Sequence, residues 1–179
     1  MRTFHHVLVP VFVCGVVELG SADIIESFEV GEGLFTSTVQ IDFANGNGYL
    51  FDVRWSSGTT TGWDLMTTIA DEIDGVSLDY STSEWGVFLQ GIDAFGDSDW
   101  GVGAGWPDVE DYWHYWTKDS AADDWLFASI GADARTVSDG SWDGWVFLSA
   151  ESPQPVGVPA PGGLLIGTLA LFTCRSRRR

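Results

Sequence analysis

Aromatic side chains are the most concentrated source of binding chemistry in this sequence of 179 residues. All ten tryptophans lie between Trp55 and Trp145. Indole and phenol rings stack on flat ligands and on the apolar faces of sugars, and they also dominate the burial of protein cores. Two interpretations therefore stay open, a core built from rings and a stacking surface for a ligand. The candidate ligand-binding residues are Trp113, Tyr115, Trp116, Trp125, Trp142 and Trp145.

A loop rich in aspartate offers a second kind of chemistry. Asp97, Asp99 and Asp108 carry the hard oxygen ligands that calcium prefers, with glycines between them. The spacing departs from the EF-hand pattern, because Gly101 stands where the third ligand belongs. A loop of solvated charges is the alternative. Calcium is a weak candidate cofactor, and no other metal is expected.

Catalytic motifs are scarce. Between Asp23 and Ser152 the sequence has one histidine, His114, no cysteine and no Gly-x-Ser-x-Gly motif. One histidine without cysteine cannot supply the usual ligands of a zinc site within one chain, and no nucleophile with a partner base is evident. A glycosidase needs two suitably spaced carboxylates, but no pair stands out. We expect a protein that is not an enzyme, and a hydrolase of surface polysaccharide is the least favoured alternative.

The charge of the same segment excludes one class of partner. From Asp23 to Ser152 there are three basic residues against twenty-five acidic ones, a formal net charge of −22. Such a field repels phosphate backbones and anionic lipid surfaces, so nucleic-acid binding is excluded. Solubility outside the cell is the simplest reason for so many carboxylates.

Residues 1–22 have the composition of a secretory signal peptide. A short basic segment precedes an apolar run from Val7 to Val17, and the small residues Gly20, Ser21 and Ala22 provide a cleavage site. The mature chain is predicted to begin near Asp23. We expect export to the cell envelope, the cell surface or an extracellular matrix.

The C-terminus has the three parts of a sorting signal. Residues 151–161 are predicted to be a linker rich in proline and glycine, and 162–179 a short transmembrane segment with an arginine-rich tail. The apolar run Leu164–Cys174 is shorter than the roughly 20 residues of a permanent spanning helix, and arginines keep such an end in the cytoplasm. An ordinary anchor helix is the alternative. The predicted sorting residues are Pro159, Pro161, Arg175, Arg177, Arg178 and Arg179.

This layout resembles the PEP-CTERM signal, with Val-Pro-Ala-Pro in place of Pro-Glu-Pro. The resemblance implies an exosortase-type sorting enzyme as a partner, and contact with the membrane through the tail before processing.

One domain, 23–150, is predicted between the two ends. Phe35–Phe43 and Tyr49–Trp55 flank Asn-Gly pairs that favour a tight turn, which predicts a β-hairpin. Apolar residues at four-residue spacing predict an amphipathic helix over Trp63–Ile73. Further strands are predicted over Val76–Tyr80, Glu84–Ala94, Tyr112–Thr117, Asp124–Ile130 and Ser141–Ser149. A hairpin, one helix and then several strands predict an α+β, β-grasp-like fold with the helix packed on a mixed sheet.

Alternation within one predicted strand divides its rings between two faces. Over Tyr112–Thr117, Trp113 and Tyr115 point to one side, and Tyr112, His114 and Trp116 point to the other. One set can pack under the helix while the other covers or binds something.

Four segments resemble DUF4430 domains, which also form the C-terminal β-domain of transcobalamin-like proteins. They occur in the order of that family, at Val87–Ala94, Tyr112–Trp116, Trp125–Ala132 and Val137–Phe147. The resemblance implies a small binding domain, which in transcobalamin-like proteins closes over a corrinoid carried by a separate helical domain. No helical companion is predicted here, so cobalamin is a candidate ligand of low rank.

These observations favour an exported, surface-sorted binding module that presents an aromatic face to a small molecule, corrinoids included, or to a glycan. The alternative is a structural component of the cell surface or exopolysaccharide matrix without a discrete ligand. Exposure of the candidate rings favours the first hypothesis, and their burial favours the second.

Overall fold

A computed structural model describes residues 23–56 and 58–156. The predicted signal peptide, the end of the predicted linker and the sorting tail lie outside these residues. The predictions for Pro159, Pro161 and the C-terminal arginines therefore remain predictions.

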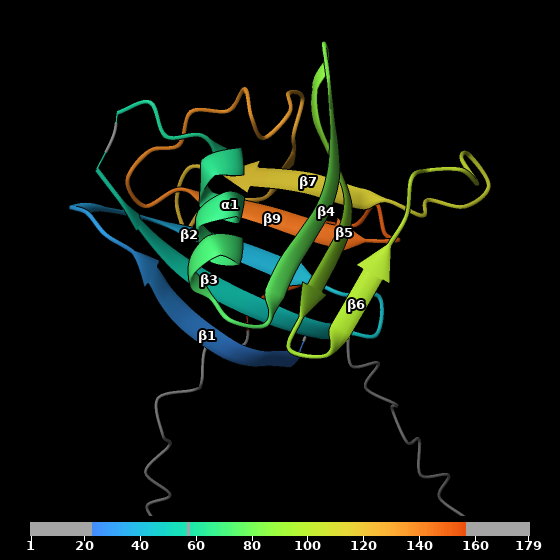
Figure 1. Cartoon of the computed structure of the whole chain (residues 1–179), viewed down its shortest axis with the longest axis horizontal. Helices are drawn as coiled ribbons and strands as arrows, with labels where there is room; N and C mark the ends of the chain where they lie inside the picture. Colours follow the sequence, from blue (N-terminus) through green and yellow to red (C-terminus); the bar gives the residue numbers. More distant parts are fainter. Residues whose placement is uncertain (1–22, 57, 157–179) are drawn as a thin grey trace, which may run out of the picture.

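The described chain forms a large and a small β-sheet with one helix. The large mixed sheet has the strand order β1-β3-β2-β9-β7-β8, and the small antiparallel sheet has the order β4-β5-β6. In Figure 1 the helix and the small sheet lie side by side in front of the large sheet. The elements are β1 Asp23–Gly31, β2 Phe35–Asp42, β3 Asn47–Trp55, α1 Gly62–Glu72, β4 Val76–Ser83, β5 Gly86–Ala94, β6 Asp97–Trp100, β7 Trp113–Lys118, β8 Leu126–Phe127 and β9 Trp142–Phe147.

The strand connections of the large sheet are those of a β-grasp. Strands β2 and β3 form the predicted antiparallel hairpin, with Val39 opposite Phe51. The last strand, β9, returns to the centre of the sheet, parallel to β2 and antiparallel to β7. The single helix packs against β1, β2 and β3 of this sheet. The predicted α+β class is confirmed.

Helix α1 begins and ends at the residues that its local sequence favours. The Thr61 side chain accepts a hydrogen bond from the Asp64 N–H, and the Asp64 carboxylate accepts one from the Thr61 N–H, which is a capping box. Leu65 and Ile69 are buried against the sheet. Gly75, at a φ of 94°, follows the last turn and allows the chain to reverse into β4.

Within the described residues, no helix is long and apolar enough to cross a membrane.

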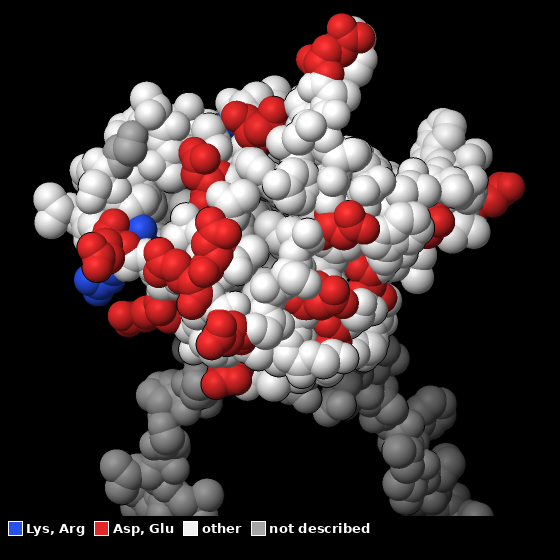
Figure 2. Space-filling view, in the orientation of Figure 1, with Lys and Arg blue, Asp and Glu red and all other residues white. Residues whose placement is uncertain are grey.

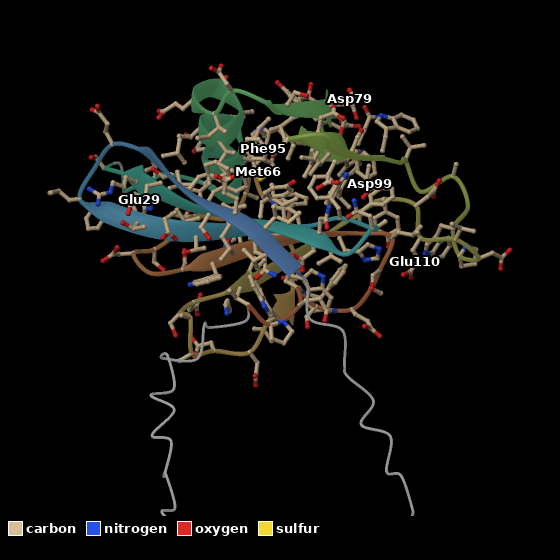
Figure 3. All side chains as sticks on the ribbon, turned by 90° about the horizontal axis from the view of Figure 1, so that it is seen from below. Glu29, Met66, Asp79, Phe95, Asp99 and Glu110 are labelled. Atoms are coloured by element: carbon tan, nitrogen blue, oxygen red, sulfur yellow. The ribbon has the colours of Figure 1, made fainter. Side chains whose placement is uncertain are left out.

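The hydrophobic core lies between the large sheet and the layer formed by α1 and the small sheet. Figure 3 shows that layer on one side of the large sheet. Alternate residues of β2 and β3 contribute to the core from the large sheet, including Val39, Ile41 and Phe51. Leu65 from the helix and Ile92 from β5 contribute to it from the opposite layer.

A short C-terminal segment covers part of the opposite face of the large sheet. We call Glu151–Val156 the C-terminal strap. Gln154 is held at both of its backbone polar groups: its carbonyl accepts from Gln40 Nε2 at 2.9 Å, and its N–H donates to Asp42 Oδ2 at 2.8 Å. Pro153 is buried. The first six residues of the predicted linker therefore pack against the folded domain.

Candidate functional site

The large sheet divides the six candidate aromatic residues into two sets of three. Trp113 and Tyr115 share one face of the sheet, as the alternation predicted, and the structure shows that this face is the core side. Their neighbours Phe147 and Trp145 on β9 pair with them in register. Trp113, Tyr115 and Trp145 are all buried. Tyr115 and Trp145 stack with ring centroids 4.5 Å apart. These three rings form part of the core, so a single aromatic face made of all six residues does not exist.

The other three rings lie on the opposite face, and two of them line a cleft. Trp125 and Trp142 are half-buried there, with ring centroids 6.3 Å apart and planes at 77°. The cleft has a volume of about 850 Å³ and is partly open to solvent. Its other lining residues come from β2, β7, the loop that follows β7, and the strap: Gln40, Lys118, Ala121, Asp123, Asp124, Glu151, Ser152, Pro153, Gln154, Pro155 and Val156.

The Lys118 ammonium lies over both indole rings. Its Nζ lies 4.6 Å from the ring centroid of Trp125 and 4.4 Å from that of Trp142, within the range of a cation–π interaction. The same ammonium donates to the carbonyl oxygen of Ala121 at 3.3 Å. Desolvation lowers the pKa of Lys118, and the nearby Asp123 carboxylate partly offsets that effect.

Carboxylates surround this aromatic pair. Asp123, Asp124 and Glu151 line the cleft, and Asp123 Oδ2 accepts a hydrogen bond from Ser120 Oγ at 2.8 Å. The cleft therefore offers two indole rings on which a flat or ring-shaped ligand can stack. Carboxylates beside them can accept hydrogen bonds, and the ammonium of Lys118 lies at the end of a flexible side chain.

A glycine on β9 allows two walls of the cleft to pack closely on the sheet. A Cβ at Gly144 would overlap Pro153 and come within 3.0 Å of Trp125. The absence of a side chain at this position lets the strap and the Trp125 ring lie directly on the sheet.

Trp116 shares the outer face but does not line the cleft. Its ring packs edge-on against Phe127 of β8, with centroids 5.2 Å apart. The neighbouring His114 is almost fully buried, and neither of its ring nitrogens has a hydrogen-bond partner within the described residues. Desolvation lowers the pKa of His114, although Glu110 Oε2 at 3.8 Å opposes this shift. His114 stacks on Tyr112 as a packed ring.

The three calcium candidates do not come together. Asp97 accepts hydrogen bonds from Asn45, Asn47 and Tyr49, with the Tyr49 hydroxyl 2.7 Å from Oδ2. Asp99 accepts one from the Ala44 N–H at 2.8 Å. Among residues 23–56 and 58–156, no group of three or more acidic, histidine or cysteine side chains is placed to hold a metal ion. Asp97 and Asp99 instead tie β6 to the turn of the β2–β3 hairpin.

One buried polar network went unrecognised in the sequence. Asp143 on β9 is fully buried and accepts hydrogen bonds from Arg135 Nε at 2.8 Å and from the Tyr115 hydroxyl at 2.7 Å. Desolvation raises the pKa of Asp143, and Arg135 and Tyr115 oppose that rise. The network fixes the loop before β9 to the sheet beside the start of α1.

Lys118 and the strap residues were also missed as parts of the site. Lys118 carried a usable signal, because it is one of only three basic residues between Asp23 and Ser152. The strap carried none, because its contacts with Gln40 and Asp42 join residues more than 110 positions apart.

No protein-family model matches this chain, and no curated protein matches it. The resemblances to DUF4430 domains and to PEP-CTERM signals accordingly remain predictions from the sequence.

Proposed function

We propose that this chain is an exported, surface-sorted binding module without enzymatic activity, and that the cleft between Trp125, Trp142 and the C-terminal strap holds its ligand. The observation that carries this proposal is the pair of half-buried indoles lining a cleft of about 850 Å³. Binding sites of this size are typically built from aromatic walls with a few polar groups.

The lining favours a sugar or a small ring-shaped molecule. An indole face stacks on the apolar face of a pyranose, while Asp123, Asp124 and Glu151 can accept hydrogen bonds from hydroxyl groups. Lys118 has a flexible stem, and a ligand ring that stacks on one of the indoles displaces the ammonium into solvent. Corrinoids remain a lower-ranked candidate, supported by the resemblance of the sequence alone.

Calorimetric titration of the purified protein tests this proposal. The titrants are cyanocobalamin and a panel of soluble neutral and acidic glycans, each with and without calcium chloride. We expect saturable binding of one compound, weakened at least about tenfold in Trp142→Ala, since truncating a tryptophan at the centre of a binding site commonly costs more than 1 kcal/mol.

Trp85→Ala is the matched control, because Trp85 is 91% exposed and does not line the cleft. Equal weakening in both variants would argue against the cleft as the site. No binding across the panel, from a protein that unfolds cooperatively, would favour a structural component of the cell surface. The burial of Trp113, Tyr115 and Trp145 in the core already supplies an ordinary structural reason for half of the candidate rings.

A further inference from the structure

An exposed tryptophan lies on the small sheet, on the other side of the molecule from the cleft. Trp100 ends β6, and 57% of its surface is exposed. The small sheet covers the core face of the large sheet, whereas the cleft lies on the outer face of the large sheet. Figure 3 places Asp79, the partner of Trp100, on the side that carries α1 and the small sheet.

The indole of Trp100 is fixed in place although it is exposed. Its Nε1–H donates to Asp79 Oδ2 at 2.8 Å, across the intervening strand β5. Gly91 of β5 is opposite Trp100 in the ladder, and a Cβ there would lie only 2.7 Å from Trp100 Cδ1. The ring therefore lies over a bare glycine backbone, held by a charge-assisted hydrogen bond at its edge.

This arrangement differs from an ordinary exposed side chain. A free tryptophan side chain loses rotamer freedom when a ligand orders it, and that loss weakens binding. The bond to Asp79 and the seat on Gly91 order the ring beforehand, so a ligand meets a pre-formed flat surface.

The same face carries a second ring and several polar groups. Phe88 is half-exposed and lies two register pairs from Gly91 towards the β4–β5 turn, about 7 Å along the strand. Ser77 and Asp93 form a hydrogen-bonded pair on this face, and Ser98 is exposed beside Trp100. Hydroxyl and carboxylate oxygens thus lie next to Trp100 on the side away from Phe88.

Charge narrows the class of ligand. Figure 2 shows acidic side chains distributed over this face, with few basic ones. Anionic chains, including phosphate esters and uronic-acid polymers, are repelled by such a surface. A ligand with apolar ring faces and many hydroxyl donors matches it.

We propose that Trp100, seated on Gly91 and held by Asp79, is a second binding site, which stacks successive sugar units of a neutral polysaccharide chain along Trp100 and Phe88. A single sugar covers only one exposed ring, so it buries little area and binds weakly. A polymer offers many equivalent units and raises the effective concentration at the ring. This site goes beyond the proposed function, because it shares no residue with the cleft.

Affinity electrophoresis of the native protein in gels cast with polysaccharide tests the proposal. The neutral probes are hydroxyethylcellulose, a mixed-linkage β-glucan, xyloglucan and galactomannan, and alginate serves as the anionic probe. We expect retardation by at least one neutral polymer and none by alginate. Trp100→Ala should weaken that retardation about tenfold in apparent affinity, which corresponds to the loss of one stacked aromatic contact.

Two further variants separate a binding role from a structural one. Asp79→Ala frees the ring, whereas Asp79→Asn keeps an oxygen that can accept from the indole N–H, so binding should fall in the first and be largely retained in the second. Gly91→Ala should weaken binding while Trp100 is still present, because the new Cβ displaces the ring. Trp85→Ala, which removes an exposed tryptophan at the turn of the same hairpin, should bind as the unaltered protein does.

Two results would overturn this site. They are unchanged retardation in Trp100→Ala and retardation by none of the neutral polymers. Trp142→Ala separates this test from that of the cleft: retardation that persists in Trp142→Ala and is lost in Trp100→Ala belongs to the small sheet alone.

Discussion

At the scale of single residues, the most consequential contact is the buried pair of Arg135 and Asp143. Asp143 has no exposed surface, and the Arg135 side chain is 14% exposed, with 2.8 Å between Nε and Oδ1. Removing the guanidinium leaves a buried carboxylate without its counter-charge, and such changes cost about 3–5 kcal/mol. Arg135→Ala should therefore lower the free energy of unfolding by about that amount in urea titrations at pH 7.

The pH dependence of the lost unfolding free energy tests whether the buried Asp143 carboxylate causes it. Desolvation already raises the pKa of Asp143, and without Arg135 the pKa rises further. Protonation then relieves the buried charge, so the deficit of Arg135→Ala should narrow as the pH falls. Arg54→Ala is the control, because the 3.9 Å pair of Arg54 with Glu29 is exposed and such pairs contribute little. A deficit of equal size in both variants would contradict this account.

At the scale of elements, Asp97 joins the small sheet to the turn between β2 and β3. Desolvation raises the pKa of Asp97, but hydrogen bonds from Tyr49, Asn47 and Asn45 outweigh it and lower the pKa below 3.8. A lowered pKa stabilises the fold above the pKa of the unfolded chain, and this stabilisation is lost as the pH falls through the folded value. Asp97→Asn should cost about 1 kcal/mol at pH 7, since the site is partly open to solvent, and the difference from the unaltered protein should shrink below about pH 4.

Asp99→Asn is the matched control for this prediction. Desolvation raises the pKa of Asp99 above 3.8, so its linkage has the opposite sign. The unaltered protein should gain stability relative to Asp99→Asn as the pH falls. Denaturant titrations of the three proteins between pH 7 and pH 3 measure both trends, and parallel curves for the two variants would contradict the assignment of Asp97.

The strands and the helix also show which parts of the fold local sequence patterns can predict. The hairpin and helix were predictable because their signals are local, in the Asn-Gly turn and in the spacing of Leu65 and Ile69. Strand β1 was not predicted, because it is an edge strand that pairs only with β3 and has an irregular register between Ile24 and Glu26. The predicted strand 124–130 is reduced to the two residues of β8, which pair with β7 at the edge of the sheet.

The candidate sites were predictable only in part, for the same reason. Sequence alternation correctly separated Trp113 and Tyr115 from Trp116, but it could not show which face the helix covers. The cleft depends on the strap, which β2 side chains hold across more than 110 positions of sequence. Trp100 gave no local signal, because Asp79 and Gly91 lie on other strands.

At the scale of the whole molecule, the two proposed sites face in opposite directions. The cleft lies on the outer face of the large sheet, and Trp100 lies on the small sheet beyond the core. A protein with two such sites can bind two polysaccharide chains at once, and a cross-linked network then forms without any contact between protein molecules. This arrangement would suit a component of an extracellular matrix, where binding and structural roles coincide.

Light scattering tests the bridging directly. With a neutral polysaccharide that binds both sites, scattering should rise with added protein and then fall, because excess protein occupies each chain separately. Trp142→Ala and Trp100→Ala should each retain part of the binding but abolish the rise, since each leaves one working site. Trp85→Ala should scatter as the unaltered protein does. A rise that persists in both single-site variants would show that protein self-association, and not opposed binding sites, links the chains.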